Sequence, residues 1–334
     1  MVYLSRLKVI SIGFALISMI IGASAAFAAD PHILLRLDPS DLIKSRLEAT
    51  RDEIGTLLRG AQSKIDYTGL AASDRAVQVR ITDANQLDAA KSVLKTVTGP
   101  RADSGIQEMA LDDSEPGLLK FTMTDASVKY RTSAALKQSI EVIKNRLHDL
   151  GVADATARQA GEGDILVQAP GAPDLQSLGK TLTRPGRLSL QLVDTSMPVN
   201  DAINGRPPAG SSVLYTLDDP PAPYLVENRV LVSGDHVLDA NATHNAVDGE
   251  PVVSFRFDSK GAERFEWATR QYVGKPFAVI LDDQVISAPI IREPIKGGSG
   301  QISGNFTDLE ASSIALLMRT GALPARLTIV EEAR

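Results

Sequence analysis

The chain has 334 residues, 43% of them hydrophobic, which is enough for two or three domains with apolar cores. Its net charge of −6 is spread along the sequence, which argues against a nucleic-acid or anionic-membrane partner because either favours a basic patch. It has no cysteine, which excludes disulfide bonds, thiolate metal ligands and a thiol nucleophile.

Residues 1–29 have the pattern of an export signal. Arg6 and Lys8 precede an uncharged, mostly apolar run, residues 9–29, whose second half is rich in small residues. Ala26-Phe27-Ala28 matches the site that signal peptidase recognises, which predicts a cleaved signal peptide. The alternative is an uncleaved inner-membrane anchor, because the apolar run is barely long enough to span a bilayer. Either interpretation places the rest of the chain in the periplasm.

Residues 30–115 have the pattern of an α/β segment. A strand is predicted at 32–38, where Asp38 is a good helix N-cap because Pro39 follows it at the first helical position. The apolar residues of the next helix fall near one side: Leu42, Ile43, Leu47, Ile54, Leu57 and Leu58. The remaining predicted elements are a strand at 76–81, a helix at 85–97 and a stop at Gly99-Pro100.

Residues 116–194 predict a ferredoxin-like βαββαβ lobe. The helix, at 133–150, has apolar residues at alternating spacings of four and three and is closed by Gly151. Around it the predicted elements are strands at 117–123, 155–159, 164–169 and 188–192, with a second helix at 174–182.

Residues 195–228 interrupt this order and predict a linker or an exposed flap. The segment is rich in proline: Pro198, Pro207, Pro208, Pro220, Pro221 and Pro223.

Residues 229–334 predict a second βαββαβ lobe, so the expected fold is α+β with two ferredoxin-like lobes after the N-terminal α/β segment. Thr307 and Glu310 form a capping box that predicts the start of the last helix. The expected elements are strands at 253–257, 277–281, 284–291 and 326–330, a helix at 259–272, and a short strand after the glycine loop 297–300.

No catalytic, metal or cofactor site is predicted, and the chain is not expected to be an enzyme. His236 and His244 lie among aspartates, but in a segment too broken for metal-ligand spacing. Asp282-Asp283 could be a carboxylate pair, although its place between two apolar strands favours a hairpin turn. The loop 297–300 lacks the lysine and serine of a phosphate-binding loop and is interpreted as a flexible connection.

A helix-covered sheet leaves a face or an edge free for a partner. Such an edge can accept an extended chain by strand addition, which needs no particular sequence. The proline-rich flap could instead cover that surface, and the sequence leaves both alternatives open.

Four stretches carry a family resemblance: DSKGAERFEWATRQ, VGKPFAVILDDQVISAPII, GGSGQISGNF and LLMRTGALPARLTIVEE. They resemble the first extracytoplasmic (P1) domain of the SecD family of protein-export membrane proteins. The resemblance implies a membrane-proximal base and a mobile head that holds the emerging preprotein. The resemblance also implies a structural or polypeptide-binding role for nine residues: Ser287, Ala288, Pro289, Gly298, Gly300, Gly321, Ala322, Leu323 and Pro324.

In that family a membrane helix follows the equivalent of residues 321–324, so we expect this chain to lack the proton-coupling membrane domain. The expected partners are unfolded secretory polypeptides and Sec translocon components, namely SecF, a SecY-type channel or a complete SecD. A role as an accessory protein of export is preferred. The alternatives are a repurposed periplasmic binding or scaffold protein with no role in export, and an extracytoplasmic enzyme.

Overall fold

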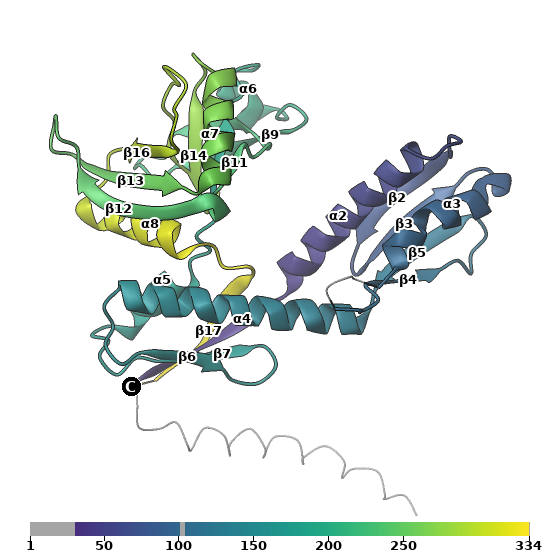
Figure 1. Cartoon of the computed structure of the whole chain (residues 1–334), viewed down its shortest axis with the longest axis horizontal. Helices are drawn as coiled ribbons and strands as arrows, with labels where there is room; N and C mark the ends of the chain where they lie inside the picture. Colours follow the sequence, from purple (N-terminus) through teal and green to yellow (C-terminus); the bar gives the residue numbers. More distant parts are fainter. Residues whose placement is uncertain (1–30, 101–103, 334) are drawn as a thin grey trace, which may run out of the picture.

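The structure is a computed structural model that describes residues 31–100 and 104–333. The predicted signal or anchor segment lies outside these residues, so its cleavage stays a prediction. Within the described ranges, no helix combines the length and the apolarity needed to cross a bilayer. The described chain is a mixture of helices and several sheets, which confirms the α+β class. Its parts are an N-terminal domain, a base and a head (Figure 1).

The N-terminal domain is one sheet, in the order β2-β3-β5-β4, covered by helices. Its elements are α2 (Ser40–Arg59), β2 (Tyr67–Ser73), β3 (Ala76–Ile81), a 3₁₀ turn (Ala84–Gln86), α3 (Leu87–Leu94), a second 3₁₀ turn (Lys95–Thr98), β4 (Met109–Asp112) and β5 (Leu118–Met123). The sequence predicted β3 correctly and missed β2 and β4, whose side chains are mostly exposed and lack a buried face. The predicted cap is displaced by one residue: Pro39, not Asp38, is the N-cap of α2 and the helix begins at Ser40, although Asp38 Oδ1 still accepts from Ser40 N at 2.9 Å.

The base is an antiparallel sheet in the order β17-β1-β7-β6. Its elements are β1 (His32–Asp38), α4 (Asp125–Asp149), β6 (Thr156–Gln159), β7 (Asp164–Gln168), α5 (Leu175–Thr183) and β17 (Arg326–Ala333). Figure 1 shows α4 passing below both the head and the N-terminal domain. The N-terminal domain is inserted between β1 and α4, and the head between α5 and β17.

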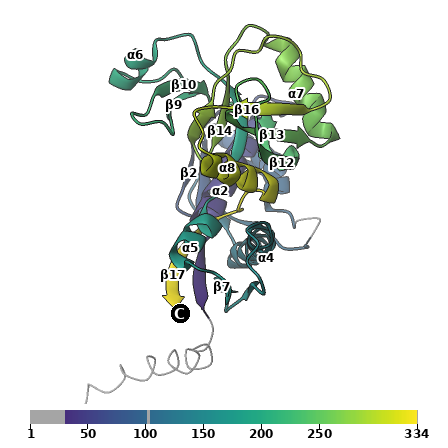
Figure 2. The ribbon, with the colours of Figure 1, turned by 90° about the vertical axis from the view of Figure 1, so that its left-hand side faces the viewer.

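The head contains a six-stranded sheet, β10-β9-β15-β14-β8-β11, and a three-stranded sheet, β12-β13-β16. Figure 2 shows it at the opposite end of the molecule from β7 and β17. Its strands are β8 (Leu188–Leu192), β9 (Ser211–Thr216), β10 (Pro223–Glu227), β11 (Val232–Ser233), β12 (Val237–His244), β13 (Pro251–Phe257), β14 (Phe277–Leu281), β15 (Gln284–Ser287) and β16 (Ser299–Ser303). Its helices are α6 (Val199–Asn204), a 3₁₀ turn (Gly234–His236), α7 (Ser259–Gln271) and α8 (Asp308–Thr320).

The strand pairings differ from the predicted ones. In the predicted lobe 116–194, the first strand (β5) pairs in the N-terminal domain and the last (β8) pairs with β14 in the head. In the predicted lobe 229–334, the strands are divided between the two head sheets, and β17 pairs with β1 of the base. The prediction assumed that strands adjacent in the chain share a sheet, whereas two insertions separate strands that pair.

The segment 195–228, for which a linker or an exposed flap was predicted, contains α6 and the β9–β10 hairpin. β9 pairs in parallel with β15, and Asp194 N donates to Leu225 O at 2.8 Å, so the hairpin extends the six-stranded sheet. The connections at 205–210 and 217–222 are nevertheless mostly exposed.

We expect limited proteolysis to cut this exposed flap before it cuts the base. A protease of low sequence specificity needs an exposed backbone that opens locally, which 205–210 and 217–222 offer and the helix α4 does not. The sites are identified by mass spectrometry of the earliest fragments. First cuts within 133–183 would show that the base, not the flap, opens most easily.

Candidate functional site

A groove of about 310 Å³ opens in the head between β14 and β16, below the loop 289–295. Its wall is mostly apolar: Leu190, Phe255, Phe265, Phe277, Val279, Ile290, Ile291, Ile295 and Ile302. Ile290 at its mouth is 63% exposed, so a large apolar side chain is in contact with solvent there. The groove therefore offers an apolar surface that is open to solvent.

Packed phenylalanines make the floor of the groove rigid. The alternation of β13 turns Phe255 and Phe257 inward, where their ring centroids lie 5.1 Å apart edge to face. Phe265 of α7 contacts both of these rings and also Phe277 of β14. The floor thus joins both sheets of the head.

One side of the groove is the outer strand β16. Among the described residues its one strand partner is β13, so its other edge carries backbone groups free of strand pairing. Gly300 lets this strand lie on the aromatic floor, because a Cβ there would be 2.8 Å from Phe255 Cζ. An apolar groove beside an open strand edge can hold an extended peptide through backbone hydrogen bonds and side-chain burial.

Three predicted site residues surround the end of β15. The Ser287 hydroxyl donates to Ser303 O at 2.7 Å and so ties this hairpin to β16. Pro289 O accepts from Phe277 N at 2.8 Å and anchors the loop over the groove. Ala288 is not in the groove wall but packs against a small separate cluster around Ile280.

The glycine loop 297–300 differs from the flexible connection that was predicted. Gly298 has φ +68° and lies so close to α7 that a Cβ would be 2.5 Å from Ala262 Cβ. Its carbonyl accepts from Phe257 N at 2.9 Å. The loop is therefore packed at Gly298 and continues into β16.

The remaining predicted residues, Gly321 to Pro324, lie apart from the groove, where the chain returns from head to base. Gly321 has φ +80°, and Leu323 is buried in the base core. Leu323 N donates to Pro185 O at 2.7 Å, so this return segment is bonded to the outgoing segment that leads into the head. Apart from Ala288, the predicted site residues therefore form two groups, one around the groove and one at the base–head junction.

Arg146 of α4 holds this junction together and was missed by the sequence analysis. Its side chain is fully buried, and its guanidinium donates to Leu182 O (2.9 Å) and Arg184 O (2.5 Å) on the outgoing segment. It also donates to Gly321 O at 3.1 Å on the return segment. Burial lowers the pKa of Arg146 to about 10, so it stays protonated at neutral pH.

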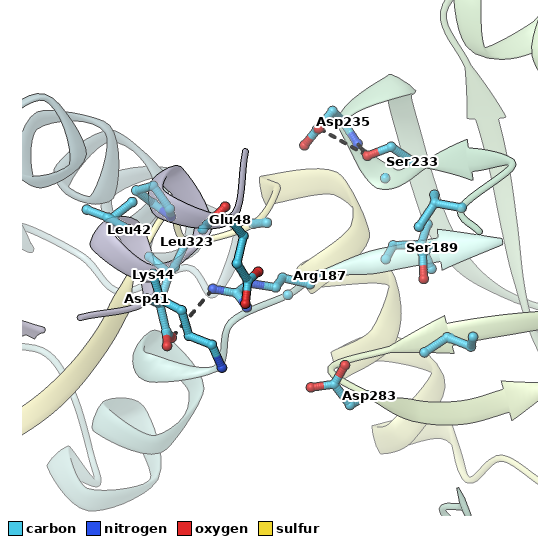
Figure 3. A pocket seen from close by; sticks show the side chains of 18 of the residues that line it. Asp41, Leu42, Lys44, Glu48, Arg187, Ser189, Ser233, Asp235, Asp283 and Leu323 are labelled. Atoms are coloured by element: carbon cyan, nitrogen blue, oxygen red, sulfur yellow. Dashed lines mark hydrogen bonds and ion pairs between the residues drawn. The ribbon is translucent and has the colours of Figure 1, made fainter. Parts of the chain in front are cut away.

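A second, charged cleft of about 790 Å³ separates α2 from the head (Figure 3). Charges of both signs line it, and Arg187 Nη2 lies 3.9 Å from Asp41 Oδ2 across it. Asp283 points into the cleft from the head. Mixed charges without a convergent cluster suit hydration and ion pairing rather than a defined ligand.

The acidic pair Asp282-Asp283 lies in the expected turn, whereas His236 lies in a 3₁₀ turn and His244 ends the strand β12. Asp282 and Asp283, at φ +53° and +64°, form the hairpin turn between β14 and β15, which confirms the turn prediction. His236 and His244 form separate pairs with Asp258 and Asp308. Within residues 31–100 and 104–333, no group of three or more His, Asp or Glu side chains is arranged to hold a metal ion.

Comparison with known proteins gives matches over both the head and the base. Residues 211–325 match the family described as "SecDF, P1 head subdomain", and residues 136–195 match "Protein translocase subunit SecDF, P1 domain, N-terminal". Protein translocase subunit SecD of Rickettsia bellii is 31% identical over 90% of this chain and 56% of its own length. That of Acetobacter pasteurianus is 30% identical over 99% of this chain and 66% of its own length.

A solved structure of SecDF, described as a membrane component that enhances protein export, is 31% identical. The match covers 60% of this chain and 92% of that chain with a TM-score of 0.48. The chain spans about half to two thirds of the length of the curated relatives cited above.

Proposed function

Because the chain belongs to the SecD family of protein translocase subunits, we propose that it is an extracytoplasmic accessory protein of Sec-dependent export. In this proposal it binds secretory polypeptide as it emerges from the translocon. Its location is the periplasm, reached through the N-terminal signal or anchor, and its partners are a SecY-type channel with SecF or a complete SecD.

The apolar head groove beside the open edge of β16 carries this proposal. An emerging secretory chain is unfolded and varied in sequence, so its receptor must bind the backbone and any apolar side chain. Strand addition to β16 satisfies backbone donors and acceptors, and the floor around Phe255 and Phe265 buries side chains of one face. Weak, sequence-tolerant binding follows from this geometry. Within it, Ser287, Pro289, Gly298 and Gly300 shape the groove, and Gly321 to Pro324 connect it to the base.

The base also supports a finer fold proposal. Its elements follow the chain order β1-α4-β6-β7-α5-β17, which is βαββαβ once the two insertions are set aside. The sheet order places the first and third strands at the centre. We propose that the base is a ferredoxin-like lobe and that the N-terminal domain and head are domains inserted into it.

The binding proposal predicts photo-crosslinking of secretory chains from Gln301. This side chain is exposed on β16 and lines the groove, whereas Gln138 is an exposed glutamine on α4 of the base. With a photoreactive residue at each position in the full chain, we expect secretory polypeptides to be captured in cells from 301 and not from 138.

A second variant links capture to the groove. Ile290→Ser removes exposed apolar surface at the mouth, and we expect the crosslinking yield at 301 to fall several-fold, as the loss of about 1 kcal/mol of apolar burial implies. Capture of neither secretory chains nor translocon components from 301 would instead favour a periplasmic scaffold outside export.

A further inference from the structure

The open edge of β16 lies between two hollows of opposite chemistry. On one face of the three-stranded sheet is the apolar groove described above. On its other face is a polar hollow of about 550 Å³, whose wall includes Asp239, Asn241, Ser254, Arg256 and Gln301. Because successive side chains of a strand point to opposite faces, a strand added to β16 would direct one row of side chains to each hollow.

Alternation along β13 and β16 separates the two faces. Phe255 is buried in the groove floor, while its neighbours Ser254 and Arg256 point to the polar face, where the first is half-buried and the second exposed. Gln301 Nε2 donates to Ser254 Oγ at 3.4 Å, so the side chain of Gln301 lies on the polar face too. Ile302, the next residue of β16, is buried and lines the groove. The edge strand itself therefore has one polar and one apolar face.

Two hydrogen bonds identify the backbone groups that face the open edge. Gly298 O accepts from Phe257 N at 2.9 Å, so at this position the backbone is turned toward β13. Ser303 O accepts from a hydroxyl of β15 at 2.7 Å, so at that position the backbone is turned away from β13. Backbone groups alternate in direction along a strand, and Ser299 and Gln301 therefore direct their N–H and C=O groups to the open edge.

Gly300 gives an added strand access to the aromatic floor. It pairs directly with Phe255 of β13, whose ring lies over it so closely that a Cβ has no room there. A residue of the added strand opposite Gly300 would direct its side chain to the groove face, where no side chain of Gly300 separates it from that ring. The neighbouring residues, opposite Ser299 and Gln301, would direct their side chains to the polar face.

We propose that the head selects extended segments in which large apolar side chains alternate with polar ones. This inference rests on the proposed function and deepens it, because it names the class of polypeptide segment that the groove binds. The apolar side chains are buried beside Phe255, and the polar ones contact the hollow around Ser254 and Arg256. A segment with its apolar residues in one block would place half of them on the polar face, where they bury polar groups without replacing their hydrogen bonds to water.

The test compares two synthetic peptides of the same composition. In the first, phenylalanine and leucine alternate with threonine; in the second, the apolar residues form one block, and both peptides have a terminal lysine for solubility. Binding of each labelled peptide to the full chain is measured by fluorescence anisotropy. We expect the alternating peptide to bind about tenfold more tightly, which the burial of one further large apolar side chain accounts for. Equal dissociation constants would overturn the proposed preference.

Backbone methylation of the alternating peptide tests strand addition itself. In an added strand, every second N–H points to β16 and the others point away from it. Methylating the N–H groups of the polar residues disrupts an antiparallel addition, and methylating those of the apolar residues disrupts a parallel one. We expect one of the two methylated peptides to lose about tenfold in affinity, as the loss of two hydrogen bonds implies, while the other binds nearly as before. Equal effects of the two methylations would overturn the proposal.

A variant of the protein tests the polar face. Arg256→Leu makes this face more apolar at an exposed position of β13, and Arg80→Leu is the same change at an exposed strand position of the N-terminal domain. We expect Arg256→Leu to bind the block peptide several-fold more tightly and so to narrow the difference between the two peptides. We expect the control to leave that difference unchanged. An unaltered ratio of affinities in Arg256→Leu would overturn the role of the polar hollow in selection.

These outcomes are separable from failure of the proposed function. If the chain has no role in export, crosslinking of secretory chains from 301 in cells is absent while the purified protein still prefers the alternating peptide. If the preference is wrong, both peptides bind equally and crosslinking persists. Binding of neither peptide would overturn the preference and would also remove the groove as the support for the proposed function.

Discussion

We expect Gly298→Ala to lower the free energy of unfolding of the head by about 3 kcal/mol or more. The added methyl group overpacks the site, and alanine disfavours the left-handed backbone conformation that glycine adopts there. The new methyl would lie 2.5 Å from Ala262 Cβ and 2.9 Å from Ala262 Cα, and backbone atoms of a helix cannot yield as a flexible side chain can. Relief therefore requires α7 to separate from β16. Because α7 carries Phe265 of the groove floor, the groove would be disrupted as well.

The measurement uses Trp267, the single tryptophan of the chain, which lies on α7 and so reports unfolding of the head by fluorescence in urea. The matched control is Gly297→Ala, one residue earlier. Its φ of +80° brings the same kind of backbone cost, but no atom lies within 4 Å of the new methyl. We expect that control to cost about 1 kcal/mol. Equal losses for the two variants would show that packing against Ala262 is not what requires glycine at 298.

The elements that sequence predicted well are those determined by nearby residues. The capping box at Thr307 forms as predicted, with Thr307 N donating to Glu310 Oε2 at 2.8 Å. Gly151 ends α4 with φ +66°, as a C-terminal glycine does. The turn at Asp282 and Asp283 follows from two adjacent residues that tolerate positive φ. Each of these signals lies within a few residues of the structure it specifies.

Strand partners could not be predicted in the same way. The alternation of Leu188, Leu190 and Leu192 shows that β8 has a buried face, but this pattern does not identify the strand that pairs with β8. Its partner, β14, lies about 90 residues further along the chain, and β17 pairs with β1 at the opposite end of the sequence. The predicted lobes therefore had the right kinds of element in the wrong sheets.

In the candidate site, too, features set by nearby residues could be predicted, whereas features set by long-range contacts could not. The motif glycines were identified by resemblance, but the physical need for Gly298 and Gly300 depends on Ala262 and Phe255, which only the fold brings near. Arg146 was missed because arginine is usually exposed. Its spacing among buried apolar residues, beside Ile143 and Leu147, was the available signal. Such a position predicts a buried arginine only if acceptors are known to surround it.

Glu108 is a second buried charge that joins distant parts of the chain. It is 4% exposed and lies just before β4, where its Oε2 accepts from Arg46 Nη2 of α2 at 2.7 Å. Its Oε1 accepts from Arg131 Nε of α4 at 2.8 Å, which links the N-terminal domain to the base helix. Burial alone would raise the pKa of Glu108, but hydrogen bonds and charges from Arg46 and Arg131 outweigh it and hold that pKa below its usual value.

We therefore expect Glu108→Gln to cost about 3 kcal/mol at pH 7, because it leaves two guanidinium groups without their shared carboxylate. A carboxyl whose pKa is lower in the folded state stabilises the fold above its unfolded pKa, about 4.3, and loses that contribution as the pH falls through the folded value. The difference in stability between the unmodified protein and Glu108→Gln is thus expected to shrink as the pH falls below about 4.

Thermal unfolding followed by circular dichroism between pH 3 and pH 7 measures this difference. The control is Glu115→Gln, which removes an exposed carboxylate paired with Arg80 and is expected to cost less than about 1 kcal/mol at any pH. If the difference in stability between Glu108→Gln and the unmodified protein stays constant with pH, side-chain packing and not the ionised carboxylate makes the contribution of Glu108 to stability. A pH-dependent gap would show that one acidic residue carries the ionic connection between α2 and α4, and hence the placement of the N-terminal domain on the base.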